Sequence, residues 1–336
     1  MRKLPLLILI FVLTALACNM PGYAPSTAES QSTYKLVTAD PNATSTPTPF
    51  QPQALIPTAD ATPNPQVVTP GDPVVTGTFV TSQNTLKILV LGSDQRQDAG
   101  FRTDVMVFVV INLDTGAISM TSFPRDLYVD IPGIGPQRLN TAQEFGGFSL
   151  TVQTFQNNFG ITPDYYLLTN FQGFTSIVDS LGGIEIDAAQ NLTDTCKLPN
   201  AVNGYCSFGP GKVAMDGQTA LWYVRSRYSS SDFDRTRRQQ EVLVGLFRKL
   251  MTLNAITKIP TLYQQFSQNV ETNIPVDVVV KLASFAPGLI TNPEKIHNYA
   301  IGTNDVWHYV TAEGAQVLLP NPERIQPILV EAINVQ

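Results

Sequence analysis

The 336-residue chain has few histidines, few cysteines and few charged residues, and each shortage excludes a class of protein. Two histidines argue against a zinc site built from imidazole ligands. Three cysteines are too few for a four-cysteine cluster or for a small fold held by many disulfides. The phosphate-binding motif GxxxxGK(S/T) does not occur. The net charge of −6 gives no general attraction to DNA or RNA, so we expect no nucleic-acid partner.

The arginines stand out against this background. Apolar residues make up 43% of the chain, too many for a protein that is disordered throughout. Residues 86–336 show no internal repeat and no second linker, which predicts a single α/β domain. Ten of the 12 arginines lie between Arg96 and Arg248. An acidic chain that gathers its guanidinium groups in one region indicates a site for a specific anion.

Residues 1–18 have the features of an export signal. Arg2 and Lys3 precede an uncharged stretch, residues 4–17, that is shorter than the roughly 20 apolar residues of a spanning helix. The stretch ends in ALAC, which resembles the lipobox where bacterial lipoproteins are cleaved and acylated on the cysteine, here Cys18. An uncleaved anchor is the alternative. Both interpretations predict an extracytoplasmic, membrane-anchored protein of the cell envelope, a lipoprotein in the first case.

Residues 19–85 are predicted to be a linker. They contain 11 of the 25 prolines and only five charged residues, a composition that gives a semi-extended tether and no core. Such a tether would hold a domain away from the membrane, although a passive spacer explains it equally well. The more apolar residues 73–81 are expected to lie against the folded domain.

Cys196 and Cys206 are predicted to form a disulfide. Nine residues separate them in a segment rich in Asn, Pro and Gly, and an oxidising compartment favours pairing. A redox function is the weaker interpretation, because the spacing is not CxxC.

The hydrophobic pattern of residues 86–336 alternates strands and helices, with one hairpin closed by a turn at 114–116. We expect strands or extended segments at 87–91, 105–113, 117–123, 127–131, 165–169 and 184–187, and short ones near Tyr299 and Tyr309. We expect helices at 149–159, 171–181, 216–224, 234–251, 261–269, 275–286 and 322–334. This order predicts a mixed sheet with helices on both faces.

Two aspartates follow or begin predicted strands. Asp94 comes after the first strand, at the edge where α/β sheets place their ligands. Asp104 opens the next strand, two residues from Arg102, so an extended chain points both side chains to one side. If the strands are neighbours, the carboxylates converge and suit Mg²⁺, which takes few protein oxygens. A surface ion pair of Arg102 with either aspartate is the alternative.

The arginine-rich segment 225–240 is the strongest single signal. Arg225 and Arg227 share a side if the chain is extended there. In the following helix, Arg235 and Gln239 fall on the same face as the apolar stripe that includes Leu243, with Arg238 alongside. Arginines that point inward near a helix N-terminus make an anion site. The alternative is a buried network of ion pairs with the neighbouring acidic residues.

These residues together indicate chemistry at phosphorus. Arginine grips phosphate through two parallel hydrogen bonds, and several arginines with Mg²⁺ fit a diphosphate better than a single carboxylate. Positioning and charge neutralisation carry most of the catalysis in such transfers. Arg125, which follows Pro124 at the end of a strand, adds a further cation.

Five segments in this order resemble the LytR-CpsA-Psr family of bacterial envelope phosphotransferases. They are LGSDQR (91–96), GFRTDVM (100–106), PRD (124–126), ALWYVRSR (220–227) and SDFDRTRRQQ (231–240). The resemblance covers about residues 86–335. Phe101 separates Gly100 from Arg102, a small departure, and a lipobox replaces the transmembrane helix of most members.

The resemblance implies an α-β-α sandwich with a hydrophobic pocket for a polyprenyl chain. It implies Mg²⁺ near Asp94 and Asp104, with Asp232 and Gln239 close to the diphosphate. It further implies diphosphate contacts from Arg102, Arg125, Arg225, Arg227, Arg235 and Arg238. The family moves a glycopolymer from a polyprenyl-diphosphate carrier to peptidoglycan and leaves a phosphodiester link.

We therefore expect a Mg²⁺-dependent phosphotransferase, with a possible pyrophosphatase side activity. Asp104 or Asp232 is the candidate base for the attacking hydroxyl, and Arg125 is the third candidate catalytic residue. A non-catalytic polyprenyl-diphosphate binding protein or envelope regulator is the first alternative. A secreted phosphodiesterase or nuclease with an open polar groove is the second.

Overall fold

The computed structural model describes residues 79, 84–94, 102–227, 232–252 and 270–336, all within the unit Pro63–Gln336. Cys18, Arg96, nearly all of the predicted linker and the helix expected at 261–269 lie outside these residues. Phe79 packs against the hydrophobic core, as expected for the segment around it. None of the helices in the described part of the chain is long and apolar enough to cross a bilayer.

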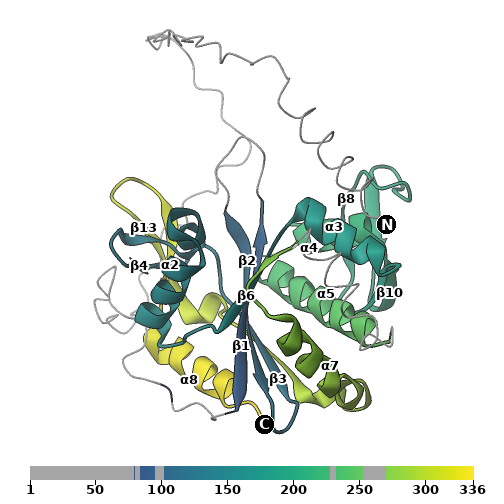
Figure 1. Cartoon of the computed structure of the whole chain (residues 1–336). Helices are drawn as coiled ribbons and strands as arrows, with labels where there is room; N and C mark the ends of the chain where they lie inside the picture. The colour runs from purple at the N-terminus through teal and green to yellow at the C-terminus, as the bar shows by residue number, and fades with distance from the viewer. Residues whose placement is uncertain (1–78, 80–83, 95–101, 228–231, 253–269) are drawn as a thin grey trace, which may run out of the picture. The chain divides into compact units, whose positions relative to one another are not determined.

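A six-stranded mixed sheet forms the centre of the described structure (Figure 1). Its strands are β1 (Thr85–Ser93), β2 (Thr103–Asn112), β3 (Ile118–Ser122), β6 (Tyr165–Asn170), β11 (Val270–Thr272) and β12 (Ile296–Ala300). The order is β11-β6-β1-β2-β3-β12. Strand β1 pairs antiparallel with β2 and parallel with β6, and β3 pairs parallel with β12. The condition for the convergence of Asp94 and Asp104, that their strands are neighbours, is therefore met.

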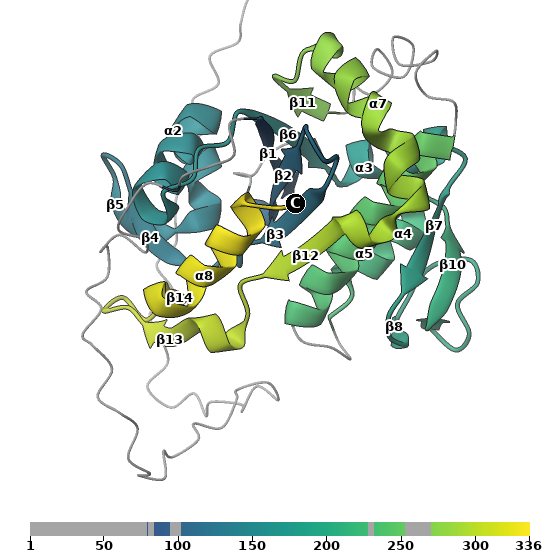
Figure 2. The same ribbon diagram turned by 90° about the horizontal axis from the view of Figure 1, so that it is seen from below.

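Helices cover both faces of this sheet. They are α2 (Ala142–Phe159), α3 (Phe171–Ser180), α4 (Gly217–Arg225), α5 (Asp232–Thr252), α7 (Val276–Thr291) and α8 (Pro322–Ile333). Three short 3-10 helices are η1 (Leu139–Thr141), η2 (Pro293–Lys295) and η3 (Thr303–Asp305). Helices α2 and α8 lie on one face, whereas α3, α4, α5 and α7 lie on the other (Figure 1). Figure 2 shows β12 between α8 and α5. The predicted α-β-α sandwich is confirmed.

Separate hydrophobic clusters hold the layers to the sheet. One cluster joins Leu89, Leu91 and Phe108 of the sheet to residues of α2 and α8. Another contains Ile88 and Val107, with apolar residues of α5 and α7 against it. Neighbouring residues of a strand point to opposite faces, so strands buried on both faces read as continuous apolar runs. This explains why β1 and β2 were recognisable in the sequence.

Helix α2 begins seven residues earlier than expected. Its sequence pattern predicted a start at Ser149, but the helix begins at Ala142. Gly146 and Gly147 interrupt it with non-helical dihedral angles, and Gly147 has a φ of 60°. Glycine is a poor helix former, so the pair concealed the first turn. The end at Gly160, in the left-handed conformation, is as predicted.

Four two-stranded sheets complete the fold, and most of their strands were not expected. They are formed by β4 (Tyr128–Ile131) with β5 (Gly135–Arg138), β7 (Ile184–Ala188) with β10 (Gly211–Met215), β8 (Leu192–Thr195) with β9 (Tyr205–Phe208), and β13 (Val306–Val310) with β14 (Gln316–Pro320). Each of these strands is only four or five residues long, which leaves too short a hydrophobic pattern to recognise in the sequence.

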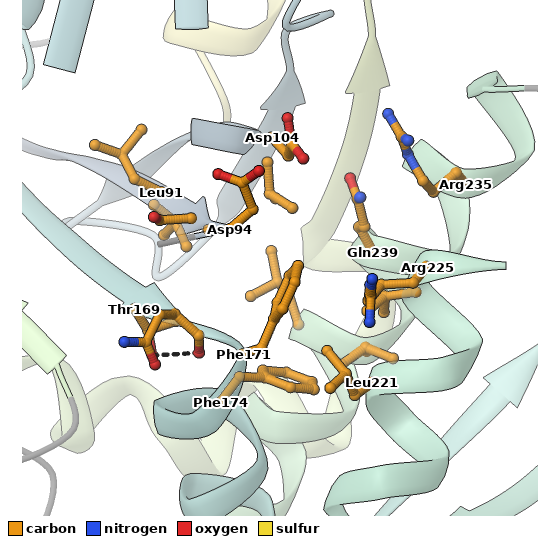
Figure 3. A pocket seen from close by; sticks show the side chains of 18 of the residues that line it. Leu91, Asp94, Asp104, Thr169, Phe171, Phe174, Leu221, Arg225, Arg235 and Gln239 are labelled. Atoms are coloured by element: carbon orange, nitrogen blue, oxygen red, sulfur yellow. Dashed lines mark hydrogen bonds between the residues drawn. The ribbon is translucent and has the colours of Figure 1, made fainter. Parts of the chain in front are cut away.

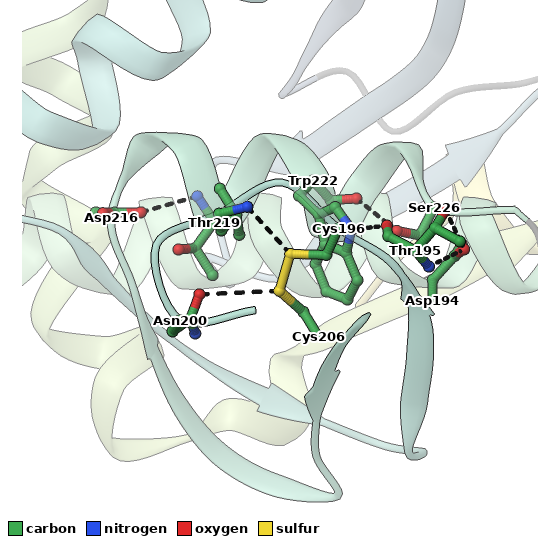
Figure 4. Close-up of a disulfide and its surroundings, with 10 residues drawn as sticks. Asp194, Thr195, Cys196, Asn200, Cys206, Asp216, Thr219, Trp222 and Ser226 are labelled. Atoms are coloured by element: carbon green, nitrogen blue, oxygen red, sulfur yellow. Dashed lines mark hydrogen bonds between the residues drawn. A yellow bond between two sulfur atoms is a disulfide. The ribbon is translucent and has the colours of Figure 1, made fainter. Parts of the chain in front are cut away.

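The predicted disulfide between Cys196 and Cys206 closes the β8–β9 hairpin (Figure 4). Both cysteines are buried. The hairpin lies against α4, where Trp222 Nε1 donates a hydrogen bond of 2.8 Å to the carbonyl of Thr195. The ring of Trp222 also contacts that of Phe208, with 5.5 Å between centroids. The disulfide therefore braces a hairpin that supports α4.

Replacing both paired cysteines by serine is expected to lower the free energy of unfolding by roughly 2–3 kcal/mol, because the open loop regains chain entropy in the unfolded state. Urea denaturation of oxidised protein measures the loss. Adding a reductant to the wild type should lower its stability by a similar amount, and should not alter the double variant. An unchanged midpoint for the variant would contradict a bracing role.

Candidate active site

A cavity of about 250 Å³ lies where several elements of the described structure end. The carboxyl end of β1, the start of β2 and the N-terminus of α3 contribute to it, as do the end of α4 and the first turns of α5. Its lining comprises Val90, Leu91, Gly92, Ser93, Asp94, Asp104, Val105, Arg125, Thr169, Asn170, Phe171, Phe174, Leu221, Val224, Arg225, Arg227, Arg235, Gln239, Val242 and Leu243. Segments distant in the sequence thus meet in one place.

The lining separates into a charged part and an apolar part. Figure 3 shows Asp94 and Asp104 on one side, with Arg225, Arg235 and Gln239 opposite. Apolar side chains such as those of Phe171, Phe174 and Leu221 lie beneath them in this view. We call this cavity the arginine–aspartate pocket. Its two parts match a ligand with an anionic group on an apolar chain.

The two aspartates are held at the paired ends of β1 and β2. The backbone N–H of Arg102 donates to Asp94 Oδ1 at 2.9 Å, and the N–H of Asp94 donates to the carbonyl of Arg102 at 3.2 Å. On β2, Asp104 Oδ1 accepts a hydrogen bond of 2.7 Å from Arg125 Nη1. The ion pair of Asp104 is therefore with Arg125 and not with Arg102.

Arg102 has a different place from the one expected. Its side chain is exposed, and it is not part of the pocket lining. Its backbone closes the β1–β2 loop onto Asp94, as described above. The structure therefore shows a positioning contact through the main chain of Arg102 and gives no support for the expected contact with a diphosphate.

Arg225 and Arg227 both line the pocket from the end of α4. Arg225 is the last helical residue and Ser226 is the helix C-cap, so the extended chain expected over 225–227 is absent, and the helix end brings both arginines to the pocket instead. Ser226 between them is buried. The guanidinium carbon of Arg225 lies 4.3 Å from the ring centroid of Phe171, a cation–π contact that orients it.

Helix α5 turns Arg235 and Gln239 into the pocket. These side chains are only 8% and 9% exposed, respectively, and Val242 and Leu243 continue the same face. The inward direction expected from helical spacing is thus observed. The alternative network of ion pairs applies to Arg237, which bonds Glu241 at 2.6 Å and lies 3.9 Å from Asp234. Asp232 begins the helix, but its side chain lies outside the described residues.

Arg238 is not among the residues that line the pocket, so the structure gives no support for its expected contact with a diphosphate. It is 1% exposed. Its Nε donates a hydrogen bond of 2.9 Å to the carbonyl of Tyr223, and its Nη2 bonds the carbonyl of Ser226. Burial lowers the pKa of this guanidinium, although arginine keeps its charge in proteins. Arg238 precedes Gln239 in α5, and the helical rotation between neighbouring residues points its side chain at α4 and not at the cavity.

Some pocket residues were not anticipated from the sequence. Thr169, Asn170 and Phe171 bring the N-terminus of α3 to the cavity. The side chain of Asn170 accepts a hydrogen bond of 2.8 Å from the N–H of Gly173 and so caps the helix. Asparagine directly after a predicted strand and before an apolar helix was the available signal.

Asp94 and Asp104 are the candidate ligands for Mg²⁺. The part of the chain that the structure describes holds no group of three or more His, Cys, Asp or Glu able to bind a metal. Asp94 and Asp104 supply two carboxylates at the same pocket. Mg²⁺ is commonly held by one or two carboxylates, with water and substrate phosphates as its other ligands. The residues present therefore fit Mg²⁺ when a phosphate ligand accompanies it.

Comparison with known proteins relates this chain to one family. The model of the LytR_cpsA_psr family matches residues 57–328. The chain is 30% identical over 241 residues to the polyisoprenyl-teichoic acid–peptidoglycan teichoic acid transferase TagU of Bacillus subtilis (strain 168), covering 70% of this chain and 76% of the relative. It is 35% identical over 195 residues to TagU of Enterococcus faecalis (strain ATCC 700802 / V583), covering 57% and 61%.

Solved structures with a similar fold include two proteins of related name. TagV of B. subtilis superposes with a TM-score of 0.62 at 26% identity, covering 75% of this chain and 98% of that one. TagT bound to LIIa-WTA superposes with a TM-score of 0.57 at 27% identity, covering 73% and 88%.

Fold and site define an α-β-α protein with a pocket in which arginines face a pair of aspartates. Within that class, the chain belongs to the LytR-CpsA-Psr family.

Replacing Arg238 by methionine is expected to lower the free energy of unfolding by about 3 kcal/mol, since two bonds from a charged donor are lost at about 1.5 kcal/mol each. The same change at neighbouring Arg237, whose ion pairs are partly exposed, should cost less. Thermal and urea denaturation of both variants measure the difference. Equal losses would contradict the assigned role of Arg238.

Proposed function

We propose that this protein transfers a glycopolymer from a polyprenyl-diphosphate carrier to peptidoglycan, leaving a phosphodiester link. The observation that carries the proposal is the arginine–aspartate pocket, in which six cationic or acidic side chains border an apolar surface. A polyprenyl diphosphate has the same division into a charged and an apolar part. The similarity to teichoic acid transferases supports the same class of reaction.

The exposed and the buried polar residues of the pocket would contact the diphosphate at different depths of the cavity. Arg225 and Arg227 are exposed, whereas Arg235 and Gln239 are buried. A diphosphate beside them would receive guanidinium donors both at the opening and deeper in the pocket. Apolar residues such as Phe174 and Leu221 would contact the first isoprene units.

Mg²⁺ belongs to this proposal as the cofactor. Bound beside Asp94 and Asp104, it would neutralise charge on the phosphates. Arg125 is already directed to this position by its bond to Asp104 and would add its charge to the reacting phosphate. Hydrolysis of the carrier diphosphate, a pyrophosphatase side activity, would follow when water replaces the acceptor hydroxyl.

The base for the acceptor hydroxyl is proposed to be Asp104 or Asp232. Asp104 lies in the pocket, where its carboxylate is also the partner of Arg125. Asp232 opens α5 three residues before Arg235, which lines the same pocket, and is the other candidate.

The proposed location is the cell envelope, outside the cytoplasm. A lipidated Cys18 and a proline-rich tether would keep the domain near a membrane that holds the polyprenyl carrier. Peptidoglycan would be the acceptor within reach of the tether.

Incubation of the full chain with a polyprenyl-diphosphate-linked glycan, peptidoglycan and Mg²⁺ tests the function. Arg225→Ala and Asp94→Ala are each expected to lower transfer about 10²–10³-fold, the usual effect of removing one charge-stabilising contact. Arg248→Ala is the matched control, because this exposed arginine lies on α5 outside the pocket. Equal product from all three variants would refute the assigned roles.

Binding without turnover has a separate outcome in the same assay. Nearly every charged pocket residue is explicable as a ligand for the diphosphate, which favours a binding protein as the second candidate function. Retention of the carrier lipid with no transfer to any acceptor would support that candidate.

Removal of the metal is expected to stop transfer, because the aspartates then repel the phosphates. Chelation with EDTA followed by Mg²⁺ should restore activity, and Ca²⁺ should restore less, since it prefers more ligands and longer bonds. Full activity in EDTA would contradict the Mg²⁺ site.

A further inference from the structure

Arg125 has a second acidic neighbour besides Asp104. Its Nε lies 3.3 Å from Oδ2 of Asp126, the next residue in the chain. Asp126 is not part of the pocket lining, so it does not face the ligand that Arg125 faces. The side chains of Arg125 and Asp126 are 24% and 32% exposed, so solvent screens their attraction only partly.

The backbone that carries this pair is fixed from two sides. The N–H of Asn140, in η1, donates to the carbonyl of Arg125 at 3.2 Å. The N–H of Leu318, in β14, donates to the carbonyl of Asp126 at 2.9 Å. The origins of the two side chains are therefore set by neighbouring elements, and only the side-chain torsions of Arg125 are left to be restrained.

Asp126 is itself held by a second arginine. Its Oδ1 lies 3.2 Å from Nε of Arg138, at the end of β5. Arg138 Nη2 donates a hydrogen bond of 2.8 Å to the carbonyl of Gln316 in β14. Charges therefore alternate from the pocket outward, in the order Asp104, Arg125, Asp126 and Arg138.

Two carboxylates lie at different nitrogens of the Arg125 guanidinium. Nη1 donates a hydrogen bond to Asp104, whereas Nε lies 3.3 Å from Asp126 in an ion-pair contact without a hydrogen bond. The attraction of Asp126 is therefore a matter of charge and draws the Nε side of the group away from the pocket. Without that charge, the pull toward Asp104 would no longer be opposed by Asp126, and Arg138 would repel Arg125.

We propose that Asp126 is a positioning residue that holds Arg125 in the orientation required for a diphosphate, with Arg138 balancing its charge. The identity of the ligand in this inference rests on the proposed function. The orientation of Arg125 does not, because it is a property of the unliganded chain.

The first measurement follows binding of farnesyl diphosphate, a short polyprenyl diphosphate, to the full chain in detergent by calorimetry. Asp126→Asn keeps the shape of the side chain and removes its charge. We expect it to weaken binding about threefold, the size of one partly exposed ion-pair contact. Asp126→Glu, which keeps the charge, should recover part of the affinity. Asp164→Asn is the matched control. Asp164 forms an ion pair with Lys87, with 3.5 Å between Oδ1 and Nζ, and neither residue lines the pocket.

The decisive comparison is a double-mutant cycle with Arg125→Met. If Asp126 acts through Arg125, the Asp126→Asn change costs nothing further once Arg125 is gone. Losses that simply add in the double variant would overturn the proposal.

The second measurement needs no ligand. The Nε–H resonance of Arg125 in protein labelled with ¹⁵N-arginine, assigned by its loss in Arg125→Met, reports the order of the side chain. We expect it to become more mobile in Asp126→Asn and to stay unchanged in Asp164→Asn. An Arg125 signal that stays ordered without the Asp126 charge overturns the proposal. If the wild type binds no diphosphate, the proposed function fails, and this signal still decides whether Asp126 positions Arg125.

Discussion

The geometry of the pocket depends on the bonds from Arg238 to the end of α4. The guanidinium bonds the carbonyls of Tyr223 and Ser226, which flank Arg225 in the chain. A helix end leaves carbonyls without partners inside the helix, and a buried cation satisfies two of them here. Because Arg238 sits on α5, this contact joins the two elements that carry most of the pocket arginines. The buried charge of Arg238 thus helps to place Arg225 and Arg235, the charged residues that line the pocket from these two helices.

Like charges close together need such support. Arg225, Arg227 and Arg235 enter one cavity, and their mutual repulsion opposes that arrangement. The structure meets the cost locally, through the ring of Phe171 under Arg225 and the aspartates on the facing side. A dianionic ligand between the two sides relieves the repulsion and gains donors already directed at it.

The sheet and most helices could be predicted, since their apolar patterns follow directly from burial. The first turn of α2 could not, because glycines at 146 and 147 break the pattern. Arg235 and Gln239 could be placed by helical spacing from Leu243 alone. Arg238 could not, because its direction matters only relative to α4, and no local pattern gives the position of that helix. The role of Asp126 could not be predicted either, because it depends on a partner that is distant in the sequence. Its second partner, Arg138, comes from a polar hairpin with no detectable periodicity.

The hairpin closed by Cys196 and Cys206 touches α4 at Trp222, one turn before Arg225. Trp222 also accepts, at its carbonyl, hydrogen bonds from the backbone and hydroxyl of Ser226. The same residue thus meets the crosslinked hairpin on one side and the arginine-bearing turn on the other. The redox state of one sulfur–sulfur bond is thereby coupled, through a single indole ring, to the support of the turn that carries Arg225.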